Sequence, residues 1–185
     1  MLIRPATLDD VQGISELLAK YYIGRLNDAQ KARGFISVEF SVAELEDMVR
    51  EPGMVVAVAN DGAIAAVAGS SPVPSKGSDA IFQNIDRLVT QLECKGRSLS
   101  SFRLCLYGPV CVDEAYVGQG LSAKLWQGFM AIVCGRYDMG LAFVSLANPA
   151  SIKAHRDKLG MTQLTEFNVV GRSYALLAFD IPAYL

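Results

Sequence analysis

Two glycines separated by one residue, Gly118 and Gly120, stand between an apolar stretch and a segment with helical spacing of apolar residues. A strand that enters a helix through glycines exposes several backbone N–H groups at the helix N-terminus, and these donors bind phosphate with help from the helix dipole. Glycine has no Cβ, so a pyrophosphate group can approach the backbone closely. The turn contains no lysine or arginine. The pattern therefore predicts either a phosphate cradle built from backbone or a plain tight turn in which glycine supplies only a positive φ.

Side chains that could move a proton lie on both sides of this turn. Tyr107 stands in the apolar stretch FRLCLYGPVCV, which Asp113 and Glu114 follow. His155 is the lone histidine of the chain, at a position on the apolar side of a later helix. An imidazole with a pKa of about 6.5 can act as proton donor or base near neutral pH. The alternative is a hydrogen-bonded histidine that only packs its helix, and for the Asp-Glu pair it is simple solvation.

Composition narrows the class of protein. The 185 residues suit one domain, and 51% of them are hydrophobic, which gives an ample core and a surplus that would suit a homodimer interface. The 17 basic and 19 acidic residues form no basic patch, so we expect no nucleic-acid partner. No apolar run reaches the ~18 residues of a membrane span, and acidic residues interrupt the start where a signal peptide would be apolar. We expect a cytoplasmic protein that binds no membrane.

The four cysteines form no CxxC pair, and one histidine cannot complete a standard zinc spacing. We therefore expect no metal site, and we expect reduced thiols, as is usual in the cytosol.

Periodicity and turn residues predict the order of elements. The chain begins with a strand over 2–4, a helix opened by Thr7 and Asp10 that continues to Tyr22, and a helix opened by Ser41 and Glu44 and stopped by Pro52-Gly53. Strands over 54–59 and 63–69 follow around Asn60-Asp61-Gly62, then a loop over 70–78, a helix over about 78–95, a strand over 102–112 and a helix from 121. The chain continues with a strand over 141–147, a helix from Asn148-Pro149 to Gly160, and strands over about 163–170 and 173–181 that turn at Gly171-Arg172. This order indicates a mixed α/β domain with a largely antiparallel sheet. Pro109 inside the strand over 102–112 implies an edge, a bulge or a splayed partner.

The glycine motif fits two nucleotide-binding patterns. Residues 118–123 match the dinucleotide pattern GxGxxG/A. A dinucleotide site, however, has its first glycine directly after the first strand of the fold and an acidic residue at the end of the next strand. Here several elements come first, and Asp138 precedes the next strand instead of ending it. The pattern therefore fits NAD poorly.

The second pattern resembles the GNAT superfamily of acetyl-CoA-dependent N-acetyltransferases, which carries R/Q-x-x-G-x-G/A after its fourth strand. The matching residues here are Val117, Gly118, Gln119, Gly120, Leu121 and Ser122. YGPVCVD resembles the fourth strand of the family, LAFVSLANPASIKAHRDKLGM its fifth strand and next helix, and RPATLDDVQGISELL its first strand and helix. Two positions depart: Val117 replaces the basic or amide residue, and Ser122 replaces the final Gly or Ala.

The resemblance implies a single N-acetyltransferase-like domain over 1–185 with an inserted helix at about 78–95. It implies a mixed, mostly antiparallel sheet flanked by helices, whose fourth and fifth strands splay apart. The pantetheine arm of acetyl-CoA would then pair with the backbone of Val110 and Val112, and an N–H near Val112 would polarise the thioester carbonyl. Asn148 would face the same arm, although Asn before Pro is also a strong helix cap.

The resemblance further implies transfer of an acetyl or short acyl group from CoA to a primary amine, on a small molecule or a protein, by direct attack in a ternary complex. His155 or the adjacent Arg156 takes the place where many relatives have a tyrosine that protonates the leaving thiolate. The candidate catalytic residues are His155 and Tyr107. The alternative function is a catalytically degenerate acyl-CoA sensor or interaction module, which Val117 and the missing tyrosine would favour. In this fold the acceptor is set by the segment from about Tyr21 to Phe40 and by the inserted helix.

Overall fold

A computed structural model of the chain describes residues 1–51, 53–74 and 79–183. By their internal contacts the residues form two compact units. Unit 1 comprises Met1–Ser71 and Tyr107–Val133, and unit 2 comprises Pro72–Leu106 and Cys134–Leu185. The expectation of one domain over 1–185 stays a prediction, and each unit is described here by itself.

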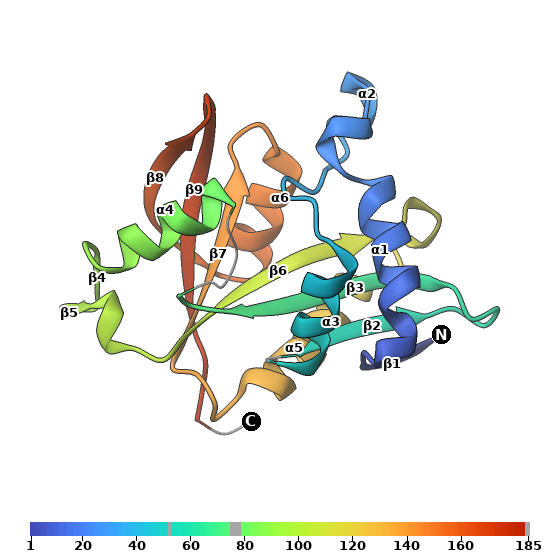
Figure 1. The fold of residues 1–185 in the computed structure, drawn as a ribbon, viewed down its shortest axis with the longest axis horizontal. Helices are drawn as coiled ribbons and strands as arrows, with labels where there is room; N and C mark the ends of the chain where they lie inside the picture. Colours follow the sequence, from blue (N-terminus) through green and yellow to red (C-terminus); the bar gives the residue numbers. More distant parts are fainter. Residues whose placement is uncertain (52, 75–78, 184–185) are drawn as a thin grey trace. The chain divides into compact units, whose positions relative to one another are not determined.

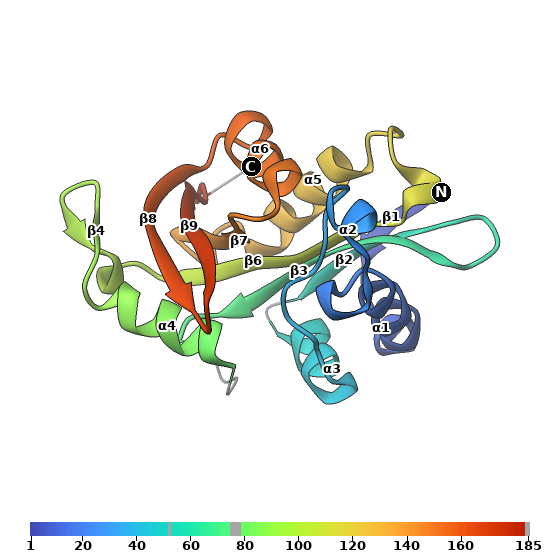
Figure 2. The same ribbon diagram turned by 90° about the horizontal axis from the view of Figure 1, so that it is seen from above.

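Unit 1 is built on an antiparallel sheet. Strand β1 (Leu2–Pro5) pairs with β2 (Met54–Val58), and β2 pairs with β3 (Ile64–Pro72). The predicted hairpin around Asn60-Asp61-Gly62 is thus confirmed. The helices α1 (Val11–Lys20) and α3 (Val42–Arg50) lie on one face of these strands, and α5 (Leu121–Val133) lies on the other (Figures 1 and 2).

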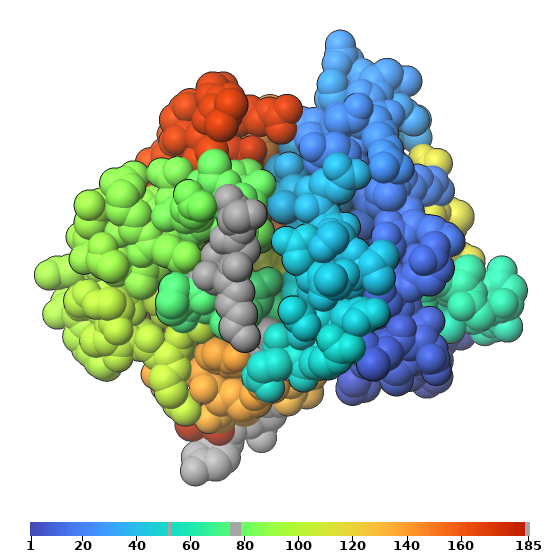
Figure 3. Space-filling view, viewed as in Figure 1, coloured from blue at the N-terminus to red at the C-terminus, as the bar shows by residue number. Residues whose placement is uncertain are grey.

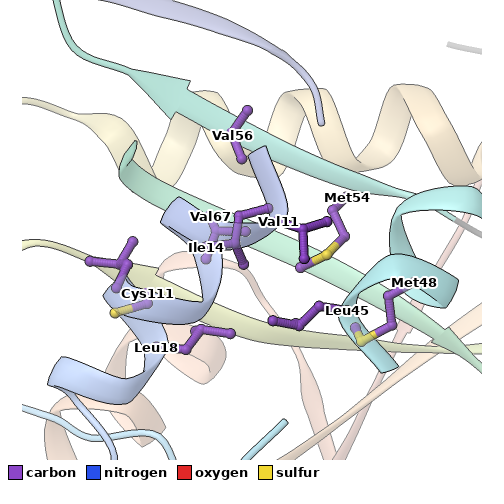
Figure 4. Close-up of a cluster of buried hydrophobic side chains, with 10 residues drawn as sticks. Val11, Ile14, Leu18, Leu45, Met48, Met54, Val56, Val67 and Cys111 are labelled. Atoms are coloured by element: carbon purple, nitrogen blue, oxygen red, sulfur yellow. The ribbon is translucent and has the colours of Figure 1, made fainter. Parts of the chain in front are cut away.

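The core of unit 1 fills the space between α1, α3 and the sheet. Figure 4 shows its side chains meeting from both helices and three strands, including Ile14, Leu45 and Val67, which are fully buried, and Cys111 from the strand that leads to the glycine motif. Burying each such aliphatic side chain contributes about 1.5–3 kcal/mol. The core therefore holds the strand before the glycine motif firmly in place.

Close packing on the opposite face depends on a glycine. A Cβ built on Gly128 of α5 would lie 2.8 Å from Cγ1 of Val55 on β2, which is closer than real Cβ contacts. Because glycine stands there, α5 approaches the sheet closely. This approach fixes the helix that follows the glycine motif.

The helix starts follow the predicted capping signals. Ser41 and Glu44 form a capping box at α3. At the other start, Asp10 accepts hydrogen bonds from the N–H and hydroxyl of Thr7, but this segment is the 3-10 turn η1 (Leu8–Asp10) and α1 follows it. The helix ends at Lys20, so the predicted extension to Tyr22 was wrong. Pro52, part of the predicted stop of the second helix, lies outside the described residues.

Residues 21–40 form an excursion that local patterns did not predict. It contains the 3-10 turn η2 (Ile23–Arg25) and the short helix α2 (Asp28–Lys31). The excursion is closed at its base by Ile36, whose N–H donates to the Tyr21 carbonyl at 2.8 Å and whose carbonyl accepts from the Ile23 N–H at 3.0 Å. Its ends are thus fixed close together.

Unit 2 contains the strands β7 (Met139–Ser145), β8 (Thr162–Val169) and β9 (Arg172–Asp180). Strand β9 pairs antiparallel with both of the others. The helix α6 (Pro149–Lys153) continues into a π-helical turn, η5 (Ala154–Lys158), and ends before Gly160 as predicted. The β8–β9 turn is centred on Val170 and Gly171, one residue earlier than predicted, because both adopt a positive φ there.

The inserted segment of unit 2 is only partly helical. The helix α4 (Ala80–Val89) stops well before residue 95, and residues 75–78, at the end of the predicted loop, lie outside the described residues. The segment continues as a hairpin of β4 (Glu93–Cys94) and β5 (Arg97–Ser98), then a 3-10 turn, η3 (Leu99–Ser101). Lys95 and Gly96 both have positive φ, as a tight hairpin turn requires, which excludes helix at this point. The predicted loop from residue 70 was also wrong at its start, because β3 runs to Pro72.

Strand β6 (Leu104–Val112) belongs to both units. The strand order is β1-β2-β3-β6-β7-β9-β8, a seven-stranded sheet in which β6 and β7 are the parallel neighbours. Their pairing begins at Leu104 with Met139 and ends at Leu106 with Leu141, although both strands continue. The mixed, mostly antiparallel sheet is therefore confirmed, and the β6–β7 ladder is limited to three residue pairs among the described residues. The splay of the two strands beyond these pairs stays a prediction.

Candidate functional site

The glycine motif lies where the sequence placed it, between β6 and α5. After β6 the chain makes one 3-10 turn, η4 (Glu114–Tyr116), and then passes through Gly118 and Gly120, which have φ of 87° and 73°. A Cβ built on either glycine would meet no atom within 4 Å among the described residues. Glycine is therefore needed for backbone conformation, and the space beside it is open to a ligand.

The main feature of this site is the backbone of residues 117–123, which we call the cradle. Within α5 the first hydrogen bond runs from the Lys124 N–H to the Gly120 carbonyl at 3.3 Å. The N–H groups of residues 118–123 meet no acceptor in the part of the chain that the structure describes. Consecutive donors at the positive end of a helix of this length bind anions without a cationic side chain.

Val117 begins the cradle as an exposed apolar side chain. Its exposed fraction is 69%, so nothing in the fold requires a valine there. Leu121 is the opposite case, since it is buried and anchors α5. Gln119 and Ser122 are exposed beside the open space. The cradle thus presents backbone and short polar groups, with no side-chain charge of its own.

Among the described residues, the second half of β6 has no ladder partner on the edge that faces away from β3. The Asp113 N–H donates to the Ala65 carbonyl of β3 at 2.9 Å. Because backbone groups alternate along a strand, Val110 and Val112 direct their N–H and C=O groups toward the opposite edge. The β7 ladder on that edge has already ended at Leu106. This geometry suits an extended ligand that pairs with backbone.

Tyr107 and Cys111 are buried titratable side chains of β6, as is Cys105. Tyr107 packs edge-on against Trp126 and Phe129 of α5, and burial raises its pKa well above the usual 10. The phenol therefore keeps its proton at neutral pH, so it cannot act as a base, and burial makes it a weaker acid than a free phenol. Burial, with a smaller contribution from Asp113, raises the pKa of the Cys111 thiol to about 12, so it is not a nucleophile.

Asn148 and His155 belong to unit 2, at the start of α6 and in the turn η5. Asn148 is buried, and its Oδ1 accepts the Ser151 N–H at 3.1 Å with Pro149 next in the chain, which confirms the predicted cap. Its predicted contact with a cofactor arm stays a prediction.

His155 is half-buried and lies beside the Ser151 carbonyl. The Nδ1–O distance is 2.8 Å. A carbonyl can only accept, so Nδ1 carries the proton and Nε2 of the neutral ring carries the lone pair. Burial lowers the pKa of His155, against a smaller opposing effect of the Ser151 hydrogen bond. The ring is therefore neutral at pH 7, which is the form of a base.

A separate hollow of about 430 Å³ opens on unit 1. The charged residues that line it are mostly acidic: Asp9, Asp10, Glu16 and Asp113 carry carboxylates, and Lys20 is basic. It borders the end of β6 but includes no residue of the cradle. Among the described residues no group of three or more His, Cys, Asp or Glu side chains is placed to hold a metal ion. No helix in residues 1–51, 53–74 and 79–183 has the length and apolar character needed to cross a membrane.

Two contacts near the cradle had no signal in the sequence. Lys20 Nζ lies 2.8 Å from Asp113 Oδ2, and the Tyr21 hydroxyl accepts the Glu114 N–H at 2.8 Å. The partners are 93 residues apart in both cases. Only the folded sheet brings them together, so no local pattern could have indicated them.

The fold is similar to those of several solved acetyltransferase structures. An N-acetyltransferase from Staphylococcus aureus Mu50 is 17% identical, with a TM-score of 0.63 over 97% of this chain and 98% of that one. A GNAT superfamily phosphinothricin acetyltransferase from Sinorhizobium meliloti, in complex with acetyl-CoA, is 16% identical, with a TM-score of 0.64 over 99% and 89%. A ribosomal-protein-alanine N-acetyltransferase from Brucella melitensis is 15% identical, with a TM-score of 0.63 over 97% and 99%.

No protein-family model and no curated protein sequence matches the chain. The structural likeness, at these identities, concerns the fold. The chain therefore has the fold of the GNAT N-acetyltransferases, as the sequence resemblance implied. In the numbering of that fold, β6 and β7 are the fourth and fifth strands.

Proposed function

We propose that this protein is an acyltransferase that moves an acetyl or short acyl group from acyl-CoA to a primary amine. The observation that carries the proposal is the run of backbone N–H groups over residues 118–123 that meet no acceptor within the described residues. They suit the pyrophosphate of CoA, because they are fixed donors at the positive end of α5. The Sinorhizobium meliloti structure of similar fold holds acetyl-CoA, which supports this assignment.

The strand edge at Val110 and Val112 supplies the second half of the donor site. An extended pantetheine arm carries amide groups that can pair with the free edge of β6, and the carbonyl of the thioester then approaches the Val112 N–H. A backbone donor at that point would stabilise the oxyanion that forms during attack. The contact of Asn148 with this arm stays a prediction from the resemblance.

The reaction needs few groups beyond correct placement. The acceptor nitrogen attacks the thioester carbon, the C–S bond breaks, and the CoA sulfur leaves as a thiolate. One proton leaves the amine and one is taken up by the sulfur. His155, neutral and with its lone pair on Nε2, would accept the amine proton. Tyr107 would donate at most a hydrogen bond, because burial raises its pKa and makes it too weak an acid to protonate a thiolate. Positioning of the two reactants supplies most of the acceleration in such a ternary complex.

The rival proposal keeps the cradle but no turnover. Val117 lacks the side-chain donor that the resemblance would place at the head of the motif, and a tyrosine to protonate the thiolate is missing. Both features would suit an acyl-CoA sensor or interaction module. The acceptor is a small-molecule or protein amine in the preferred proposal. Homodimer formation and cytoplasmic location stay predictions.

Calorimetric titration of the purified protein with acetyl-CoA tests the donor site. We expect micromolar binding. Release of free CoA in the presence of a panel of primary amines then separates the enzyme from the sensor. Absence of acetyl-CoA binding would overturn the proposal, and binding without amine-dependent CoA release from any amine would favour the sensor.

A charge variant tests whether the cradle is the binding site. Ser122 is exposed in the first turn of α5. A carboxylate added there would stabilise the helix by about 0.3–1 kcal/mol through its interaction with the helix dipole. Ser122→Glu should therefore fold normally but repel pyrophosphate, and we expect the Kd for acetyl-CoA to rise about tenfold or more, that is ~1.4 kcal/mol. Ser122→Gln, of matched size without charge, is the control and should stay within about twofold. An unchanged Kd in Ser122→Glu would place the cofactor elsewhere.

A further inference from the structure

The end of α1 is tied to the segment that leads into the cradle. Lys20 pairs with Asp113 at 2.8 Å, and the Tyr21 hydroxyl accepts the Glu114 N–H at 2.8 Å. The Lys20 ammonium also lies 5.2 Å from the centre of the Tyr21 ring, so the two side chains form a cation–π contact with each other. The segment after β6 lies beside the end of α1 in both ribbon views, and its yellow atoms border the blue atoms of α1 and α2 in the space-filling view (Figures 1, 2 and 3).

Asp113 determines the shape of this segment. Its N–H is bonded to β3, its carbonyl accepts the Tyr116 N–H at 2.9 Å, and its Oδ1 accepts the Ala115 N–H at 3.0 Å. Its other carboxylate oxygen is the partner of Lys20. With the Tyr21 hydroxyl on the Glu114 N–H, every amide from Asp113 to Tyr116 has an acceptor. The turn η4 is thus fully defined by hydrogen bonds immediately before the donors of the cradle begin.

We propose that Lys20 and Tyr21 are positioning residues that set the direction of the cradle amides. The proposal rests on the proposed function and names two residues outside the sequence motif that the donor site requires. The coupling acts over a short stretch of chain, because Glu114 is only a few residues before Gly118. Both glycines have open space around them and no side chain to fix them. Fixing η4 from α1 therefore limits the positions of the cradle amides at the start of the cradle, while α5 limits them at its end.

The same contact reaches the excursion over residues 21–40. The Tyr21 carbonyl closes the base of the excursion through the Ile36 N–H, and Arg33 within it lies 3.3 Å from the carboxylate of Glu114. The exposed Arg33 pair is worth little by itself. Tyr21, however, contacts the turn η4 with its side chain and the excursion with its backbone. It is therefore the more informative residue to change.

Removal of the hydroxyl tests the role of Tyr21. In Tyr21→Phe the Glu114 N–H loses its acceptor while the ring stays, and we expect the Kd for acetyl-CoA to rise roughly three- to tenfold, as loss of about one hydrogen bond would give. Tyr22→Phe makes the same chemical change at the next residue and should leave the Kd unchanged. An unchanged Kd in Tyr21→Phe, with tight binding by the unaltered protein, would overturn the inference.

The lysine is tested by a variant and its rescue. Lys20→Met keeps the length of the side chain but loses the charge, and it should raise the Kd for acetyl-CoA about as much as Tyr21→Phe does. Lys20→Arg keeps a donor for Asp113 and should restore most of the affinity. Lys31→Met, which removes the exposed pair with Asp28 in α2, is the control. Equal losses in Lys20→Met and Lys20→Arg would contradict a positioning role through Asp113.

A measurement on the free protein separates this inference from the proposed function. The backbone ¹H–¹⁵N chemical shifts of Gly118 and Gly120 report the cradle without any ligand. They should move in Tyr21→Phe and Lys20→Met and stay in place in Tyr22→Phe. If the unaltered protein does not bind acetyl-CoA, the proposed function fails, but these chemical shifts still test the positioning role. Shifts that do not move in Tyr21→Phe and Lys20→Met would overturn the positioning role.

Discussion

At the scale of single residues, our proposal makes His155 the side chain whose protonation controls the rate of acyl transfer. Its Nδ1–H is held by the Ser151 carbonyl at 2.8 Å, so only Nε2 can take a proton. Burial lowers the pKa of the ring below its usual 6.5. The basic form therefore prevails above about pH 6.5, and acid converts it to the inactive imidazolium below that pH.

The pH dependence of turnover tests this role. We expect kcat/KM to fall toward acid with a midpoint below about 6.5, and we expect His155→Gln to lose this acidic limb together with about 100-fold or more of the rate. Arg156→Gln is the matched control on the adjacent residue and should keep the limb. If turnover of His155→Gln stays within about twofold of the unaltered protein, the histidine only packs its helix.

The candidate site was predictable to the extent that it is local in the chain. The spacing of Gly118 and Gly120 indicated the cradle, and Asn148 before Pro149 indicated the cap, because both signals act within a few residues. The environment of Tyr107 was not predictable, because its burial comes from Trp126 and Phe129 on another element. The same holds for Tyr21, whose hydroxyl meets a backbone amide 93 residues later.

The entry into α1 shows the same distinction at the scale of elements. The Thr7 and Asp10 signal was read correctly as a helix start, but the acceptor Asp10 also binds Arg4 of β1 through both guanidinium nitrogens, at 2.6 and 2.8 Å. The hydrogen bond from Arg4, followed by those from Thr7 and opposed by burial, lowers the pKa of Asp10 to about 2. The carboxylate therefore joins the first strand to the first helix.

The stability of this junction should depend on pH. A carboxyl whose pKa is lower in the folded protein stabilises it above the unfolded pKa, and that contribution disappears as the pH falls through the folded value. Arg4 is 31% exposed, so solvent weakens the pair, and we expect Asp10→Asn to lower the free energy of unfolding by about 1–2 kcal/mol at pH 7. In urea denaturation the difference from the unaltered protein should shrink between about pH 4 and pH 2.

The neighbouring carboxylate provides the control for this measurement. Asp9 is exposed, and Asp9→Asn should change the free energy of unfolding by no more than about 0.5 kcal/mol. A loss in Asp10→Asn that is the same at pH 7 and near pH 2 would show that the junction depends on side-chain packing and not on the charge.

Elements that rest on short-range chemistry were predicted best. The hairpin at Asn60-Asp61-Gly62 and the cap at Ser41 follow from turn and capping residues alone. The hairpin of β4 and β5 was missed because Leu92, just before it, continues the apolar spacing of α4. The positive φ of Lys95 and Gly96 decides the structure instead. The helix α2 was missed because it has only four residues and no buried side chain.

At the scale of the whole molecule, the donor site in our proposal depends on two features of β6 and the turn after it. The free edge at Val110 and Val112 would hold the pantetheine arm, and the cradle would hold the pyrophosphate. The end of the β6–β7 ladder after three residue pairs leaves the first feature, and the open space beside the glycines provides the second. Neither feature alone distinguishes CoA from other nucleotides.

Thermal unfolding with three ligands should show that both features are needed. Acetyl-CoA at 100 times its Kd stabilises a folded protein by about 2.7 kcal/mol, which for a chain of this size raises Tm by roughly 5–10 °C. Acetyl-pantetheine has the arm without the pyrophosphate, and NADH has a pyrophosphate without the arm. At the same concentration each should raise Tm by much less than acetyl-CoA does, because each engages one feature only. A shift with NADH as large as that with acetyl-CoA would mean that the cradle binds nucleotides without help from β6, and the acyl-CoA assignment would then be wrong.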